Sequence, residues 1–147
     1  MKSSDSRQQY GRVLLVDDHT QLRQMLALAL HIYGFEVREA ATSAEAFRWL
    51  ATNRPAVVVL DLQSNTDGLT VLRTIRQRAP LDDLPLVFLA SERTDELRWQ
   101  ALKAGADWFC FKPLSLRELQ EHVGDLSVRG RPRLRALGGQ ANHRLAG

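Results

Sequence analysis

Three aspartates and one lysine each stand directly after a short apolar run of the sequence. These residues are Asp17, Asp18, Asp61 and Lys112. Carboxylates that gather in one cleft repel one another strongly where the effective dielectric constant is low, so they need a divalent cation or an ammonium group beside them. Mg²⁺ is suited to this task because it binds one or two carboxylates together with water and phosphate oxygens. A carboxylate in such a site can act as a nucleophile and form an acyl phosphate.

Five strand-like runs, which alternate with five helix-like stretches, would position these four residues. The runs are rich in Val, Leu and aromatic residues, and they span residues 12–16, 35–39, 56–60, 86–89 and 108–111. Alternating strands and helices predict right-handed crossovers and a parallel sheet covered on both faces, an α/β doubly wound fold. Ligands of such sheets bind beyond the carboxyl ends of the strands. The four charged residues are therefore expected to share one site there.

The length and composition of the chain fit one globular domain. It has 147 residues, of which 44% are hydrophobic and 25% are charged. No apolar run is long enough to cross a membrane, and the polar first ten residues do not resemble a secretory signal. We therefore expect a cytoplasmic protein without membrane contact. The single cysteine, Cys110, lies between two phenylalanines and is expected to be a small buried hydrophobic residue.

Charge is distributed unevenly along the chain. The formal net charge is +3, yet the segment from residue 127 onward carries five arginines and no acidic residue. The preceding part is mildly acidic, so the domain itself is not expected to bind nucleic acid. Hydrophobic periodicity fades after residue 126 and glycines follow. We predict a flexible lead over residues 1–10, a domain over 11–126 and a basic flexible tail over 127–147.

Several segments, in this order, resemble the receiver domain of two-component response regulators. The opening acidic pair of the family is matched by Val-Leu-Leu-Val-Asp17-Asp18. The phosphoacceptor strand is matched by Val-Val-Val-Leu-Asp61, followed by Asp67-Gly68-Leu69. The closing segment is matched by residues 104–113, in which Lys112 precedes Pro113. The resemblance covers about residues 11–126. It implies a flavodoxin-like fold with five parallel strands in the order 2-1-3-4-5 and five flanking helices.

The resemblance also implies a role for each matching residue. Asp61 would accept a phosphoryl group from a histidine kinase, a phosphotransfer protein or a small phosphodonor, and Lys112 would contact the phosphoryl oxygens. Mg²⁺ would be held by Asp17, Asp18, Asp61 and the backbone carbonyl of Gln63. The bond between Lys112 and Pro113 would typically be cis. The chain would signal through contacts with an output protein and would not be a conventional enzyme, although it would catalyse its own phosphorylation and dephosphorylation.

Two departures from the family pattern affect how such a domain would switch. The family usually has a Thr or Ser hydroxyl at the end of the fourth strand, where this chain has Ala90. Ser91 is adjacent, but strand alternation would direct it to the other side. Asn65 replaces a usual proline, and the loop after Asp61 is one residue shorter. The coupling between the phosphoryl group and the output surface, including the switch aromatic at the position of Phe109, is therefore in question.

Two further features suggest partners. Trp99 lies about 200° around the fourth helix from Leu97, so we expect it to point away from the core and either to meet a partner or to cover a loop. The output face of the family includes this helix, and the sequence leaves open whether two copies associate there. The tail sequence with Arg129, Arg131 and Arg133 resembles an AT-hook, but a solvated tail is the favoured interpretation.

The sequence supports one principal function and three alternatives. The principal hypothesis is a stand-alone receiver, a phosphorylation-controlled interaction module without an attached output domain. The first alternative is a pseudo-receiver, whose fold persists while phosphoryl signalling has lapsed, and the second is a DNA-binding adaptor that acts through the basic tail. The third, a phosphatase with an aspartyl intermediate, is disfavoured because Gln63, not a second aspartate, stands two residues after Asp61.

Overall fold

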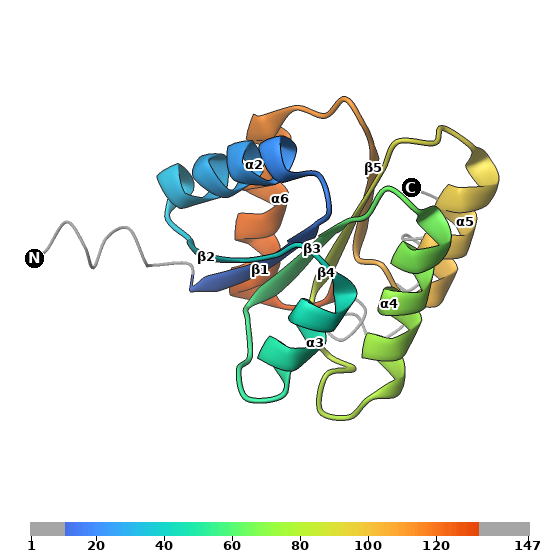
Figure 1. The fold of residues 1–147 in the computed structure, drawn as a ribbon, viewed down its shortest axis with the longest axis horizontal. Coiled ribbons are helices and arrows are strands. Elements are labelled where there is room, and N and C mark those ends of the chain that lie inside the picture. The colour runs from blue at the N-terminus through green and yellow to red at the C-terminus, as the bar shows by residue number, and fades with distance from the viewer. Residues whose placement is uncertain (1–10, 133–147) are drawn as a thin grey trace, which may run out of the picture.

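A five-stranded parallel sheet forms the centre of the computed structural model, which describes residues 11–132 (Figure 1). The strand order is β2-β1-β3-β4-β5, which confirms the predicted fold. The strands are β1 (Arg12–Asp17), β2 (Glu36–Ala40), β3 (Val57–Asp61), β4 (Leu86–Ala90) and β5 (Trp108–Phe111). The helices are α2 (Thr20–Tyr33), α3 (Ser43–Leu50), α4 (Asn65–Gln77), α5 (Asp95–Ala104) and α6 (Leu116–Arg129). None of the helices in this part of the chain is long and apolar enough to cross a membrane.

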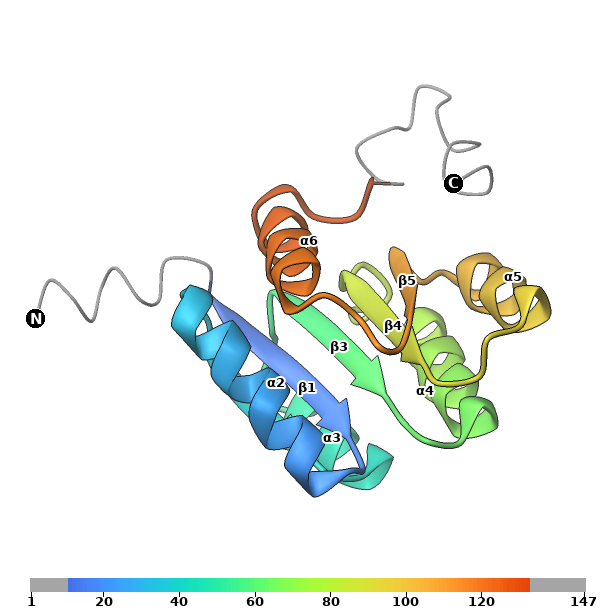
Figure 2. The same ribbon diagram turned by 90° about the horizontal axis from the view of Figure 1, so that it is seen from above.

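Two hydrophobic cores cover the two faces of the sheet. Helices α2 and α6 pack on one face, and α3, α4 and α5 pack on the other (Figures 1 and 2). Successive side chains of a strand point to opposite faces, so Val58 enters one core while Val57 and Val59 enter the other. Strand β3 is consequently buried along its whole length, as the uninterrupted apolar run predicts.

Each of the five helices begins at a side chain that caps its first turn. The capping residue accepts a hydrogen bond from the backbone N–H three residues further on, which satisfies a donor that has no partner within the helix. The caps are His19, Thr42, Ser64, Thr94 and Ser115. Ser64 starts α4 only three residues after Asp61, which fixes the path of the loop between them.

The ordered chain continues beyond the predicted domain boundary at residue 126. Helix α6 ends at Arg129, and Arg131 lies against the fold with only 5% of its surface exposed. The prediction of a solvated tail from residue 127 was wrong over these residues because a buried carboxylate, Asp107, binds the Arg131 guanidinium. Residues 1–10 and 133–147, including Arg133, lie outside the described part of the chain.

Gly105 at the end of α5 is expected to tolerate no side chain. Its φ is +114°, and an added Cβ would lie 2.9 Å from Nε of Arg76. Gly105→Ala should lower the free energy of unfolding by at least about 1–2 kcal/mol, the cost of the left-handed conformation alone. Chemical denaturation would measure this. Gly11→Ala is the matched control, because φ there is +87° but the nearest neighbour of a Cβ is Ala56 at an ordinary 3.5 Å. A loss no larger than that of the control would refute the crowding against Arg76.

Candidate functional site

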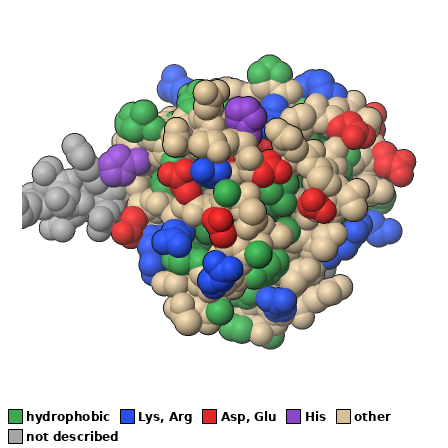
Figure 3. Space-filling view, viewed as in Figure 1, with side chains coloured by type: hydrophobic (Ala, Val, Ile, Leu, Met, Phe, Trp, Pro, Cys, Tyr) green, Lys and Arg blue, Asp and Glu red, His purple; other side chains and the backbone are tan. Residues whose placement is uncertain are grey.

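Asp17 and Asp61 end two neighbouring strands and lie side by side. They are paired in the register of β1 and β3, and their exposed fractions are 1% and 2%. The Nζ atom of Lys112, which directly follows β5, lies 2.8 Å from Oδ1 of Asp61. In the space-filling view, acidic side chains surround a basic one near the middle of the face shown (Figure 3). The structure therefore brings together three of the four charged residues predicted to share a site.

Each of the two buried carboxylates has one oxygen with a partner and one without. Oδ1 of Asp17 accepts a hydrogen bond of 2.8 Å from the His19 N–H, and Oδ1 of Asp61 binds Lys112. Within residues 11–132, the only buried side-chain oxygens or nitrogens that lack a hydrogen-bond partner are Oδ2 of Asp17 and Oδ2 of Asp61. Buried polar atoms without partners are costly. The pair thus has the two free oxygens that a cation held by carboxylates requires.

The electrostatic balance of this pair also favours an added positive charge. The pKa of Asp17 is raised from its usual 3.8 to about 6, because burial and the neighbouring Asp61 raise it more than the His19 N–H and Lys112 lower it. The single ammonium of Lys112 therefore does not neutralise both carboxylates. A divalent cation between them would favour the charged form of Asp17.

Asp18 lies at the rim of the site rather than in it. It is exposed, and its oxygens Oδ1 and Oδ2 lie 3.1 and 3.3 Å from the backbone N–H of Gln63, which donates to them. In the described part of the chain, no three Asp, Glu, His or Cys side chains form a cluster that could hold a metal ion. A Mg²⁺ ion needs only one or two carboxylates, so the buried pair fits it. The roles of Asp18 and of the Gln63 carbonyl in metal binding stay predictions.

The two loops beyond β4 and β5 complete the surroundings of the pair. Ala90 is buried at the end of β4, whereas Ser91 is exposed. The N–H of Lys112 donates to the carbonyl of Ala90 at 2.7 Å, and the peptide bond between Lys112 and Pro113 is cis, as the resemblance implied. A methyl group therefore stands at the end of β4, and its correspondence to the hydroxyl position of the family stays a prediction.

Phe109 belongs to a buried cluster of aromatic rings. Its ring stacks on Phe88 with the centroids 5.7 Å apart, and it meets the edge of Phe111 at 5.0 Å. Only 9% of Phe109 is exposed. A Cβ at Gly68 of α4 would lie 3.0 Å from the Phe88 ring, so Phe88 packs closely against α4 at a position that favours glycine. The predicted switch aromatic is thus packed inside the protein.

Two predictions about single residues can be compared with the structure. Trp99 on α5 is 50% exposed, which confirms its predicted outward direction and leaves its partner a prediction. Cys110 is half-buried, and burial raises the pKa of its thiol. A thiol with a raised pKa is a poor nucleophile at neutral pH, which agrees with the hydrophobic role expected for it.

The tail arginines differ in their availability to a partner. Arg129 is exposed and pairs with Asp125 at 2.9 Å within α6, whereas Arg131 is buried in an ion pair with Asp107. The disfavoured alternative in which Arg131 contacts nucleic acid is inconsistent with its position, because its guanidinium already has protein partners. An acidic residue at the start of an aromatic strand, Asp107, was the one signal in the sequence that could have indicated this contact.

A row of exposed apolar side chains on α2 was missed in the sequence. Met25, Leu28 and Ile32 are 48%, 58% and 71% exposed. Their spacing of three and four residues places them on one side of the helix. Helix α2 begins just after the Asp17–Asp18 pair, so this apolar row starts close to the site.

Comparison with known proteins identifies the class. Residues 13–124 match the family model of the response regulator receiver domain. Response regulator MprA of Mycobacterium sp. strain KMS is 38% identical over 122 residues, which are 82% of this chain and 52% of MprA. The chain spans about half the length of the curated relatives it matches.

Two solved structures show the same fold. The receiver domain of Francisella response regulator 1452 is 28% identical, with a TM-score of 0.74, and the match covers 80% of this chain and 97% of that one. The receiver domain of sensor histidine kinase PA1611 of Pseudomonas aeruginosa, solved with a magnesium ion in its active site cleft, is 24% identical with a TM-score of 0.71 and the same coverages. With its fold, buried aspartate pair and lysine, the chain belongs to the receiver domain family of two-component response regulators.

Proposed function

We propose that Asp61 accepts a phosphoryl group and that the resulting acyl phosphate controls contacts with other proteins. The observation that carries this proposal is the unequal environment of the two Asp61 oxygens: Oδ1 is held by Lys112 at 2.8 Å, and Oδ2 has no partner. Oδ2 would attack phosphorus as the bond to the leaving group of the donor breaks. Lys112 would then face the new negative charge, which a positioned ammonium stabilises.

Mg²⁺ is the cofactor that this site fits best. Because Oδ2 of Asp61 is the proposed nucleophile, Oδ2 of Asp17 and the other carboxylate oxygen of Asp61 would supply the ligands, and the bound ion would neutralise charge on the transferring phosphoryl group. The magnesium ion in the receiver domain of PA1611 supports the same choice. Asp18 and the carbonyl of Gln63 complete the proposed ligand set, and His19 holds Asp17 in place through its N–H.

The proposed partners are a phosphodonor and an output protein. A histidine kinase or phosphotransfer protein, or a small phosphodonor, would supply the phosphoryl group. The exposed apolar row of α2, next to the site, supports contact with a helical protein donor. Trp99 on α5 offers a surface for the output protein or a second copy of the chain. We further propose that the chain acts in the cytoplasm as a signalling domain that catalyses only its own phosphorylation and dephosphorylation.

A second candidate function, a pseudo-receiver that binds its partner regardless of phosphorylation, is favoured by one observation. Ala90 provides no hydroxyl toward the site, and Phe109 already lies in the buried aromatic stack. In that case, the output surface would be the same with and without the phosphoryl group. The nucleophile and the lysine are present in both cases, so only experiment separates them.

The decisive test is the uptake of a phosphoryl group. The protein is incubated with Mg²⁺ and acetyl phosphate, and its intact mass is recorded over time. We expect one added phosphoryl group on the wild type and none on Asp61→Asn, which keeps the shape of the side chain but lacks the nucleophilic carboxylate. Asp67→Asn, at an exposed aspartate on α4, is the matched control and should be phosphorylated like the wild type. A folded wild type without any adduct would refute phosphotransfer and favour the pseudo-receiver.

A further inference from the structure

Three charged residues lie together at the end of the sheet opposite the aspartate pair. The side chain of Asp107 is fully buried and pairs with two arginines. Its Oδ1 lies 3.0 Å from Nε of Arg131, and its Oδ2 lies 3.0 Å from Nη2 of Arg76. Oδ2 also accepts a hydrogen bond of 2.9 Å from the N–H of Leu86 at the start of β4. We call Arg76, Asp107 and Arg131 the arginine clamp.

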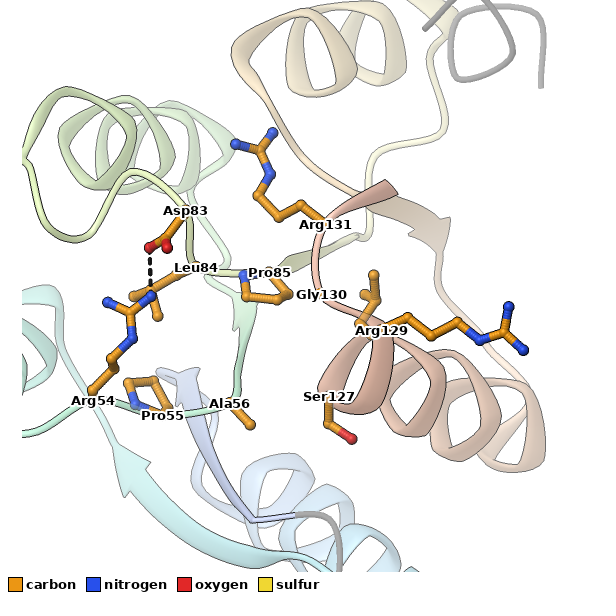
Figure 4. Close-up of a pocket in the computed structure, with 11 residues that line it drawn as sticks. Arg54, Pro55, Ala56, Asp83, Leu84, Pro85, Ser127, Arg129, Gly130 and Arg131 are labelled. Atoms are coloured by element: carbon orange, nitrogen blue, oxygen red, sulfur yellow. Dashed lines mark hydrogen bonds and ion pairs between the residues drawn. The ribbon is translucent and has the colours of Figure 1, made fainter. Parts of the chain in front are cut away.

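The clamp fastens the segment after α6 to two loops of the fold. Both arginines donate to the carbonyl of Gly105, which ends α5, and Arg131 also donates to the carbonyl of Asp82 at 3.1 Å. Arg129 and Arg131 leave the chain in different directions (Figure 4). Arg131 thus anchors the segment from within, while Arg129 stays exposed.

Gly130 and Arg131 also form part of the wall of a groove of about 390 Å³. Leu84, Pro85 and Leu126 contribute to its lining, and the N–H of Gly130 donates to the carbonyl of Leu126 at 2.8 Å, which fixes the backbone at the Arg129–Gly130 bond. A protease needs this backbone to open locally before it can cut. The rate of cleavage at this bond therefore reports how firmly the clamp is closed.

Two stiff elements connect the clamp to the aspartate pair. Strand β5 is bracketed by Asp107 at one end and Lys112 at the other. Helix α4 starts four residues after Asp61 and carries Arg76 near its far end. A displacement of Lys112 or of the loop after Asp61 would therefore reach the clamp through a strand and a helix, which transmit movement because packed cores resist deformation.

We propose that the arginine clamp is loosened when the phosphoryl group is bound, so that the segment after α6 is released. This inference rests on the proposed function. In the structure, Lys112 binds the Asp61 carboxylate while the oxygens of Asp107 already accept hydrogen bonds of 2.9 and 3.0 Å. Asp107 is thus held by donors from three separate segments, namely β4, α4 and the chain after α6, so a shift of β5 alone cannot keep all three bonds. The clamp thereby links the phosphorylation state to the attachment of Gly130 and Arg131 to the fold.

Limited proteolysis with trypsin tests the clamp directly. Cleavage after Arg129 gives a chain that ends at residue 129, which intact mass identifies, and trypsin does not cut the following Arg131–Pro132 bond. Arg131→Ala should be cleaved after Arg129 at least about fivefold faster than the unmodified wild type. Phosphorylated wild type should also be cleaved at least about fivefold faster, since couplings between sites typically correspond to factors of 5 to 150. Arg117→Ala removes an exposed arginine of α6 and should leave the rate of cleavage after Arg129 unchanged.

Lys112→Ala separates this inference from phosphotransfer itself. The variant disturbs the end of β5 without any phosphodonor, so it should also accelerate cleavage after Arg129. If wild type gains no phosphoryl group but Lys112→Ala still speeds cleavage, the proposed function fails and the coupling stands. If neither phosphorylated wild type nor Lys112→Ala differs from unmodified wild type, the coupling is overturned. Equal rates for Arg131→Ala and wild type would show that the clamp does not hold the segment at all.

Discussion

Asp107→Asn is expected to lower the free energy of unfolding by about 3–5 kcal/mol, the usual cost of removing one partner from a buried ion pair. The substitution keeps the shape of the side chain but removes the charge that faces two guanidinium groups. The side chains of Arg76 and Arg131 are only 11% and 5% exposed. Both buried guanidinium groups would therefore lose the carboxylate that they share.

Urea denaturation with and without the substitution measures this loss. Asp125→Asn is the matched control, because Asp125 also pairs with an arginine, Arg129, but is 50% exposed. An exposed pair four residues apart on a helix contributes only about 0.3–0.5 kcal/mol. If the two variants lost similar stability, the buried clamp would contribute no more than a surface pair.

The fold could be predicted because apolar periodicity depends mainly on local sequence. Val57 to Leu60 are apolar without interruption, and such a run is stable only when both faces of its strand are covered. Once the strands were placed, Asp17, Asp61 and Lys112 had to lie at the same edge of the sheet. The site was therefore predictable from the strand ends and not from any property of the aspartates alone.

Contacts between distant charged residues could not be predicted in this way. Arg131 lies 24 residues after Asp107 in a stretch rich in glycine and arginine, whose composition indicates a solvated tail. Nothing local distinguishes it from Arg129, which is exposed. Asp18 shows the same limit, because its position next to Asp17 does not reveal that its side chain turns to the N–H of Gln63.

The second large effect expected is a fall in the free energy of unfolding as pH rises, which Mg²⁺ offsets. In the absence of Mg²⁺, the pKa of Asp17 is about 6 in the folded chain against 3.8 ordinarily. Between these values the folded state binds more protons than the unfolded state, so the free energy of unfolding falls as pH rises from about 4 to about 6. A shift of this size corresponds to roughly 3 kcal/mol, and the loss is complete above pH 6.

Asp17→Asn isolates this contribution. The substituted side chain carries no charge and can still accept the His19 N–H, so the variant should gain stability over wild type as pH rises from 4 to 7 in EDTA. Contributions from carboxylates far from Asp17 are the same in both proteins and cancel in the difference. Mg²⁺ at pH 7 should stabilise the wild type, because it binds the charged folded form, and should stabilise the variant less. A difference between the two proteins that stays constant from pH 4 to 7 would contradict the raised pKa. An equal response to Mg²⁺ would instead show that Asp17 is not a metal ligand, and the aspartate pair would then owe its proximity to the fold alone.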